Sequence, residues 1–339
     1  MTRPPQSRLT HSLGLGPTVR PLNVFALASS TLLSISFLVF LNGIQPFYLS
    51  GVLKVPSNLL GNITGNLILA DELLALGLVF VWGAVADRIT FRWVAVVGHV
   101  FVALGFGLYT VSRRVYPEVL GSRLVFSVGA SALVTTLGAA LAGMTAITNV
   151  EDEAGDAAPS EESPLLQHSS LETFEHPANP AHSARLAGLL GFCAGSGALL
   201  AVFGFLRLPT ILSPHLDDSL KTAILYTFYI VAALALCEAL FLIFGLKLRG
   251  SSLEVGNEEA LSDGHHETAG WKASVVGVLH ELTKGFRIAC SESEVALACG
   301  SAFVTRAQAI VVSAFIPLFI NEVQFFIFWN QAGPPPHIA

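Results

Sequence analysis

Seven long apolar runs, separated by polar segments, dominate the chain. They lie near residues 22–49, 66–86, 93–111, 118–147, 184–206, 222–246 and 294–320. A helix needs about 20 apolar residues to cross the hydrocarbon core of a bilayer, and each run is close to that length. The pattern therefore predicts an all-α membrane protein with about seven transmembrane helices.

The polar segments divide the chain into seven parts. These are a cytosolic N-terminal tail (1–21), the first four spans (22–148), an acidic loop (149–183), the fifth and sixth spans (184–246), a central cytosolic linker (247–293), the seventh span (294–320) and an irregular C-terminal tail (321–339). The acidic loop has too little apolar surface to fold alone, so we expect it to be disordered. Near the end of the linker, apolar residues recur at helical spacing beside basic ones. This predicts an amphipathic helix that lies on the membrane surface or packs on the inner face of the bundle.

Loop Lys and Arg residues predict the orientation, because they concentrate on the cytosolic side of a membrane protein. An N-terminus in the cytosol leaves the larger number of them inside. The adjacent pair Arg113 and Arg114 is then an exception on the outer side. With this orientation the acidic loop and the central linker both face the cytosol.

Composition agrees with a membrane location and excludes several classes of protein. Charged residues make up 12% of the chain and hydrophobic residues 53%, whereas soluble domains carry about 25% charged residues. The net charge of −6 comes mostly from loops and does not point to nucleic acid as a partner. The four cysteines lack ligand-like spacing, so we expect neither a metal site nor a disulfide framework. Without a nucleotide loop or a nucleophile elbow, we also expect no cofactor and no enzymatic activity.

The loop between the second and third runs carries the most informative motif, which spans residues 83–92. Gly83 would permit close helix approach, and Arg88 and Arg92 would hold the loop on the cytosolic side. With Asp87 the motif reads G-x-x-x-D-R-x-x-x-R. It resembles the loop between helices 2 and 3 of the major facilitator superfamily.

The resemblance implies a fold, an activity and a role for the loop. Members of this superfamily are secondary transporters with two six-helix halves, each built from inverted three-helix repeats, around a central substrate site. By resemblance, Asp87 pairs with charges of the opposite half and latches the cytosolic side shut; a simple helix cap is the alternative. We therefore expect a bundle of this type with about seven of twelve helices present, and a missing C-terminal half that a complete transporter needs.

Ionisable residues inside the predicted spans are candidates for substrate binding or proton coupling, because a charge in lipid costs at least a few kcal/mol. Asp71 and Glu72 are expected about a turn and a half into the second span, and Glu238 lies inside the sixth. The basic candidates are Arg123 in the fourth span and Arg306 in the seventh. Desolvation favours a neutral carboxylate and a nearby arginine favours a charged one, which is the physical basis of a proton-coupling site. Ion pairs that only hold helices together are the alternative.

Neighbouring polar residues refine this picture. Asp71 and Glu72 point about 100° apart on a helix, so we expect one to face the cavity and the other a neighbouring helix. Asn42 and Gln45, three residues apart on the first span, could line the same cavity. Pro46 follows them and predicts a bend in that helix.

These features favour a secondary active transporter of a small molecule, coupled to protons and working by alternating access. Its expected partners are the lipid bilayer, the substrate and protons. A non-transporting fragment, a membrane adaptor and a seven-helix receptor are the alternatives, and the cytosolic N-terminus argues against the receptor.

A short motif in the acidic loop concerns the location of the protein. Glu161 stands four residues before the pair Leu165 and Leu166, as in acidic di-leucine sorting signals. If adaptor proteins read this motif, the protein resides in a vacuolar or endosomal membrane. If the leucine pair is incidental, the plasma membrane is the alternative.

Overall fold

The fold is known from a computed structural model, which describes residues 21–86, 90–156, 180–215, 220–246, 287, 291–316, 318–320 and 323. Within these ranges every regular element is helical. Six helices there are long and apolar enough to cross a membrane, namely Pro21–Val52, Ser57–Gly83, Phe91–Val111, Val115–Gly138, Arg185–Leu212 and Leu220–Gly245. The prediction of an all-α, multi-pass membrane protein is confirmed.

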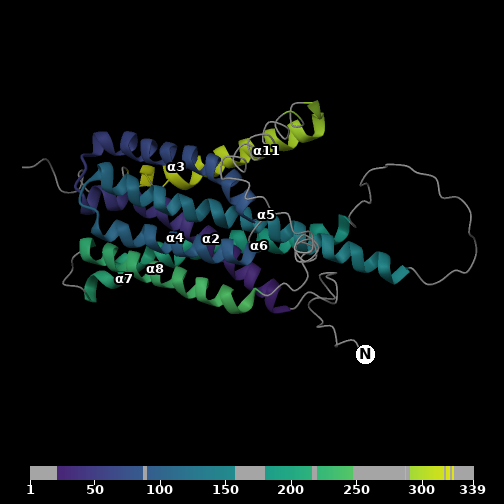
Figure 1. Ribbon diagram of the computed structural model, residues 1–339. Helices are drawn as coiled ribbons and strands as arrows, with labels where there is room; N and C mark the ends of the chain where they lie inside the picture. The colour runs from purple at the N-terminus through teal and green to yellow at the C-terminus, as the bar shows by residue number, and fades with distance from the viewer. Residues whose placement is uncertain are drawn as a thin grey trace, which may run out of the picture.

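The six candidate spans lie side by side (Figure 1). The long elements are α2 (Pro21–Phe47), α3 (Ser57–Ala86), α4 (Phe91–Val111), α5 (Leu120–Asp156), α6 (Pro180–Phe203), α8 (Leu220–Gly245) and α11 (Ser293–Ile310). The short elements are η1 (Tyr48–Val52), η2 (Val115–Val119), η3 (Phe205–Arg207), α7 (Leu208–Leu212), η4 (Ser213–His215) and η5 (Val311–Phe315).

The packing of the six spans has an internal symmetry. The most extensive contacts join α4 to α5, α4 to α8, α2 to α6, and α3 to α5. Exchanging the first three spans (α2, α3, α4) with the second three (α5, α6, α8) turns the α2–α6 contact into the α5–α3 contact. The same exchange turns the α4–α8 contact into itself. The most extensive contact, α4–α5, maps onto the much less extensive α2–α8 contact, so the exchange relates part of the packing of the two groups of three and not all of it.

Glycines set the close approach of α4 and α5. A Cβ added at Gly129 would lie 2.7 Å from the backbone N of Val102 and would collide with the carbonyl oxygen of Gly98. A Cβ at Gly105 would lie 2.7 Å from the Cβ of Phe126. Small residues let membrane helices pack backbone to backbone, and here only glycine fits. At Gly83 an added Cβ would meet no described atom within 4 Å, and the expectation of close helix approach there stays a prediction.

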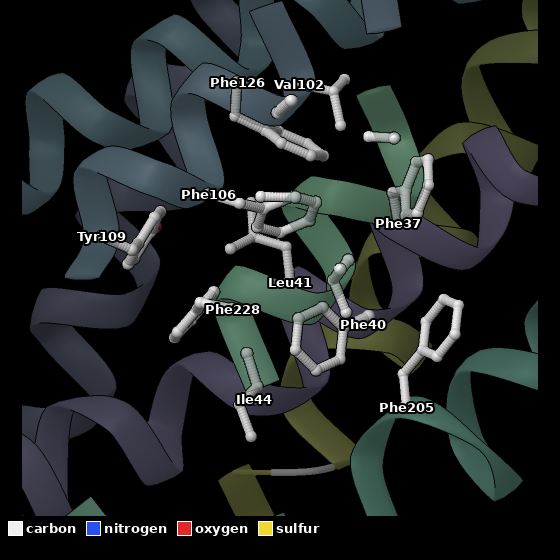
Figure 2. Packing of buried hydrophobic residues seen from close by; sticks show 14 of the residues in the cluster. Phe37, Phe40, Leu41, Ile44, Val102, Phe106, Tyr109, Phe126, Phe205 and Phe228 are labelled. Carbon is white, nitrogen blue, oxygen red and sulfur yellow. The ribbon is translucent and has the colours of Figure 1, made fainter. Parts of the chain in front are cut away.

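An aromatic core fills the centre of the bundle (Figure 2). Phe40 of α2, Phe106 of α4 and Phe228 of α8 lie with ring centroids 5.7–6.0 Å apart. Phe37 of α2 contributes a ring 6.0 Å from that of Phe106. Edge-to-face and offset aromatic pairs of this kind contribute about 0.5–1.5 kcal/mol each beyond their buried area. The core thus joins the first group of three spans to the second.

Helix α3 begins nine residues before the predicted start of the second span. Its first ten residues include Asn58, Asn62 and Asn66, which interrupt the apolar run without ending the helix. Extending a formed helix costs little, so polar residues alone do not stop it. As a result Asp71 is the fifteenth residue of a helix of 30 residues. The prediction that it lies a turn and a half from the helix end is wrong.

The acidic loop is also shorter than predicted. Helix α5 continues to Asp156, and α6 begins at Pro180. Residues 149–156 and 180–183 are therefore helical, although they were expected to be disordered. Alanine and glutamate, which are frequent at the end of α5, are strong helix formers and carry the helix beyond its apolar part.

Helix α11 forms where the seventh span is predicted, and it projects from the bundle beside α3 (Figure 1). It is not among the six candidate spans of the described chain, and several of its side chains lie outside the described residues. The segment after it returns to α3, where Leu318 Cδ2 lies 3.7 Å from the Cβ position of Gly61. The seventh span stays a prediction. The predicted amphipathic helix lies, apart from Arg287, outside the described residues.

Candidate functional site

A buried ion pair joins α3 to α5 inside the bundle. Arg123 Nη2 lies 3.0 Å from Asp71 Oδ2, and Arg123 Nε donates to the same oxygen at 3.1 Å. Arg123 is 1% exposed and Asp71 is 7% exposed. Ser127, one turn after Arg123, donates to the backbone carbonyl of Asp71 at 3.1 Å. Asp71 is thus the member of the Asp71/Glu72 pair that faces another helix of the bundle.

Two amide side chains of α2 complete the coordination of the same guanidinium group. Arg123 Nη2 donates to Asn42 Oδ1 at 2.8 Å, and Arg123 Nη1 donates to Gln45 Oε1. Asn42 and Gln45 lie on one face of α2 because residues three apart are neighbours on a helix. The structure therefore brings together four of the predicted candidates, Asn42, Gln45, Asp71 and Arg123. We call them the Arg123 cluster.

Two buried polar atoms adjoin the cluster without a hydrogen-bond partner among the described residues. They are Gln45 Nε2 and the hydroxyl of Tyr109. Gln45 is 1% exposed and Tyr109 is fully buried. The Tyr109 hydroxyl lies within range of the charges of Arg123 and Asp71. A buried polar group without a partner is uncommon in folded proteins, and each one calls for an explanation.

Packing fixes the position of Tyr109. Its ring stacks on Phe228 with 5.1 Å between centroids (Figure 2). The Tyr48 hydroxyl donates to the backbone carbonyls of Tyr109 and Ser112, at 2.8 and 3.1 Å. Sequence reasoning missed Tyr109, and the available signal was a tyrosine inside an apolar run.

Glu238 forms a separate polar contact. It is 6% exposed, and its Oε1 accepts a hydrogen bond from Ser29 Oγ at 2.8 Å. Ser29 lies thirteen residues before Asn42 on α2, which is about 20 Å along a helix. The structure therefore does not bring Glu238 to the Arg123 cluster. The two acids also differ in partner, because Asp71 meets a guanidinium group and Glu238 meets a hydroxyl group.

The remaining candidates inside the spans are less informative. Glu72 is half-buried on α3 beside Asp71. Arg306 lies on α11, and its side chain is outside the described residues.

The loop motif is described only at its two ends. Gly83 lies in the last turn of α3, and the Arg92 guanidinium carbon stands 5.0 Å from the ring centroid of Trp93. Asp87 and Arg88 lie outside the described residues, and the latch stays a prediction. The sorting residues Glu161, Leu165 and Leu166 also lie outside them.

His99 of α4 is a second buried polar residue that sequence reasoning missed. It is fully buried beside Phe37, with 6.3 Å between ring centroids. Its Nδ1 lies 3.0 Å from the carbonyl oxygen of Ala95. Its Nε2 has no partner among the described residues. A single histidine within an apolar run was the available signal.

No family model, curated protein or solved structure matches the chain. Within the described ranges, no group of three or more His, Cys, Asp or Glu residues could hold a metal ion. The functional interpretation therefore rests on the fold and on the geometry of the Arg123 cluster.

Proposed function

We propose that this chain is a secondary active transporter of a small molecule, of the major facilitator type, that works by alternating access. The Arg123 cluster carries the proposal. It is a polar, charged site inside an apolar bundle, and its members come from both groups of three spans. Asn42, Gln45 and Asp71 belong to the first group, and Arg123 belongs to the second. Ionisable residues buried within membrane spans usually mark substrate or ion paths.

The symmetry of the helix contacts supports the same fold type. Inverted repeats of three helices require each contact to have a counterpart after the two repeats are exchanged. The α2–α6 and α3–α5 contacts are such counterparts, and the α4–α8 contact is its own, whereas the α4–α5 contact has only the much smaller α2–α8 contact as its counterpart. These paired contacts agree with the fold that the loop motif implies, and the motif and the contacts are independent observations.

Energetics argue against the cluster as a simple means of stabilisation. Replacing a buried ion pair by well-packed apolar residues is often neutral or stabilises a protein by about 1–4 kcal/mol. Intramembrane charges are rare, and they usually mark substrate paths or proton relays. An arginine, a carboxylate and two amides in one place are therefore better explained by ligand binding than by stability.

Proton coupling is the second part of the proposal, and Glu238 is its first candidate. The partner of Glu238 is the Ser29 hydroxyl, which can donate to a carboxylate and accept from a carboxylic acid. Glu238 can therefore gain and lose a proton without breaking an ion pair. Asp71 is the second candidate, because its ion pair with Arg123 must open first.

Access to the cluster from the two sides of the membrane tests the proposal. Ser127→Cys, in a chain whose four native cysteines are replaced by alanine, places a thiol one turn from Arg123 with little change in volume. Alternating access predicts that a membrane-impermeant maleimide labels this thiol from either side of a sealed vesicle. Leu104→Cys is the control, because Leu104 is exposed on the apolar outer face of α4 and its thiol should stay unlabelled. Labelling of Ser127→Cys from neither side, or from one side only, would refute alternating access.

A further inference from the structure

The end of the bundle nearest the Arg123 cluster carries exposed cations. The turns from α2 to α3, from α4 to α5 and from α6 to α8 share this end, because consecutive spans run in opposite directions. The hydrogen bond from the Tyr48 hydroxyl to the Ser112 carbonyl joins two of these turns. The Lys and Arg side chains of the three turns are all exposed. We call them the basic rim: Lys54, Arg113, Arg114, Arg207 and Lys221.

Glu118 is the acidic residue within the described part of these turns. Its carboxylate is bound by backbone N–H groups, since it accepts hydrogen bonds from those of Arg113 and Arg114. It therefore orders the turn that carries two cations of the rim. The α6–α8 turn also contains Asp217 and Asp218, which lie outside the described residues, so the sequence of the three turns holds five basic and three acidic residues. An excess of one sign of charge raises the local concentration of ligands of the opposite sign.

The rim lies close to the cluster along the chain. Lys54 follows Gln45 by nine residues, and Arg114 precedes Arg123 by nine residues. A helix rises about 1.5 Å per residue, and the extended residues Arg114 and Tyr116 make the path from Arg114 to Arg123 longer than a nine-residue helix. The rim and the cluster are therefore neighbours along two of the three turns.

The chemistry of the cluster also suits an anion. A guanidinium group presents a planar set of donors that matches a carboxylate. The carboxylate of Asp71 occupies two of these donors in this structure, so it shows what kind of group the position accepts. Gln45 Nε2 belongs to the cluster and the Tyr109 hydroxyl lies within range of its charges, and both atoms are buried without partners among the described residues. Both can donate to further oxygen atoms of a ligand.

We propose that the transported molecule is a small organic anion that carries a carboxylate. It enters past the basic rim, replaces Asp71 as the partner of Arg123, and accepts hydrogen bonds from Gln45 Nε2 and the Tyr109 hydroxyl. This inference rests on the proposed transport function and adds the substrate class and two residues that determine specificity, Gln45 and Tyr109.

Binding to the purified chain tests the substrate class. The probes are the sodium salts of acetate, lactate, succinate and citrate, each compared with its uncharged amide at constant ionic strength. Thermal unfolding in detergent is followed at increasing probe concentration, and the apparent Kd is taken from the rise in Tm. We expect at least one of the acids to raise the Tm while its amide does not.

Substitutions then locate the binding site. Arg123→Gln should abolish the rise in Tm. Tyr109→Phe should weaken the apparent Kd by about 2–10-fold, because it removes one hydrogen bond and keeps the ring. Arg113→Gln combined with Arg114→Gln should weaken the apparent Kd and reduce its dependence on salt. Arg185→Gln, an exposed arginine at the opposite end of the bundle, is the matched control and should change neither quantity.

Three results would overturn the inference. They are stabilisation by the amides as well as the acids, stabilisation by none of the four acids, and a response that is unchanged in both Arg123→Gln and Tyr109→Phe. If Arg123→Gln does not fold, Tyr109→Phe and the rim variant still decide the outcome. The vesicle labelling of Ser127→Cys separates this inference from the proposed function. Two-sided labelling without anion binding would leave transport intact and refute the substrate class, whereas anion binding without two-sided labelling would refute transport.

Discussion

The Asp71–Arg123 ion pair makes a quantitative prediction about stability. Asp71→Asn keeps the shape of the side chain but removes its charge, and leaves a guanidinium group that is 1% exposed without a counter-charge. Removing one partner of a buried ion pair costs about 3–5 kcal/mol. The entropy of unfolding is about 2.1 cal/mol/K per residue, so in a chain of 339 residues each kcal/mol lowers Tm by about 1.4 °C. We therefore expect Asp71→Asn to lower the Tm by about 4–7 °C.

A double-mutant cycle measures how much of this cost belongs to the pair. Thermal unfolding in detergent is compared for the parent chain, Asp71→Asn, Arg123→Gln and the double variant. The double variant should be more stable than the sum of the single effects predicts, by a few kcal/mol, because the second substitution removes the charge that the first leaves unpaired. Glu72→Gln is the matched control. It makes the same chemical change one residue away, at a half-buried position, and should cost less than about 1 kcal/mol.

Two results would contradict this reasoning. One is a cycle in which the single effects add to within about 0.5 kcal/mol, which is the behaviour of independent sites. The other is an Asp71→Asn variant as stable as Glu72→Gln. Either result would mean that Asp71 and Arg123 do not depend on each other inside the bundle.

Three further predictions follow from individual contacts. Gly129→Ala should destabilise the chain by about 1–3 kcal/mol, because its Cβ would lie 2.7 Å from a backbone nitrogen. Gly107→Ala is the control: its Cβ would meet no described atom within 4 Å, so it should be neutral or slightly stabilising in the same thermal assay. Tyr48→Phe removes the donor to two carbonyl groups and should cost about 1–2 kcal/mol, whereas Tyr226→Phe at an exposed position should cost almost nothing; equal Tm values for these two variants would contradict the assignment. Glu238→Gln keeps an acceptor for Ser29 but cannot titrate. Uptake of the substrate into vesicles should therefore lose its pH dependence, while the abundance of the protein in the membrane stays unchanged. Uptake that retains the parental pH dependence would exclude Glu238 as the proton carrier.

Hydrophobic patterning predicted most of the architecture, because a bilayer demands long apolar helices wherever the chain crosses it. It failed where helix and apolar run do not coincide. Because of three asparagines at the start of α3, the apolar pattern missed more than two turns of that helix. It missed about two more turns at the acidic end of α5. Backbone hydrogen bonds extend a helix without regard to the polarity of its side chains, so the ends of a run do not mark the ends of a helix.

The members of the Arg123 cluster could be named from the sequence, but not their partners. An ionisable residue in an apolar run stands out, and Asn42 and Gln45 stand out for the same reason. Which acid meets Arg123 depends on the face that α3 presents to α5, and the angle between Asp71 and Glu72 on the helix left that choice open. The Trp82 indole, which donates to the Val128 carbonyl of α5 at 3.0 Å, belongs to the same helix contact. No local pattern carries that information.

The distribution of close backbone contacts indicates which parts of the bundle can move. Helices α4 and α5 are interlocked at Gly98 and Gly129. A Cβ added at Gly197 of α6 would collide with the Leu32 carbonyl of α2, and Ser36 of α2 donates to the Gly197 carbonyl at 2.7 Å. Two tight pairs, α4–α5 and α2–α6, therefore face each other across a seam.

The polar contacts of the candidate site cross this seam. Asn42 and Gln45 reach from α2 to Arg123 on α5, and Ser29 reaches from α2 to Glu238 on α8, which packs against α4. Hydrogen bonds between side chains can be exchanged for bonds to a substrate or a proton, whereas interlocked backbones must separate before they move. Substrate and proton would then act on the same movement of α2.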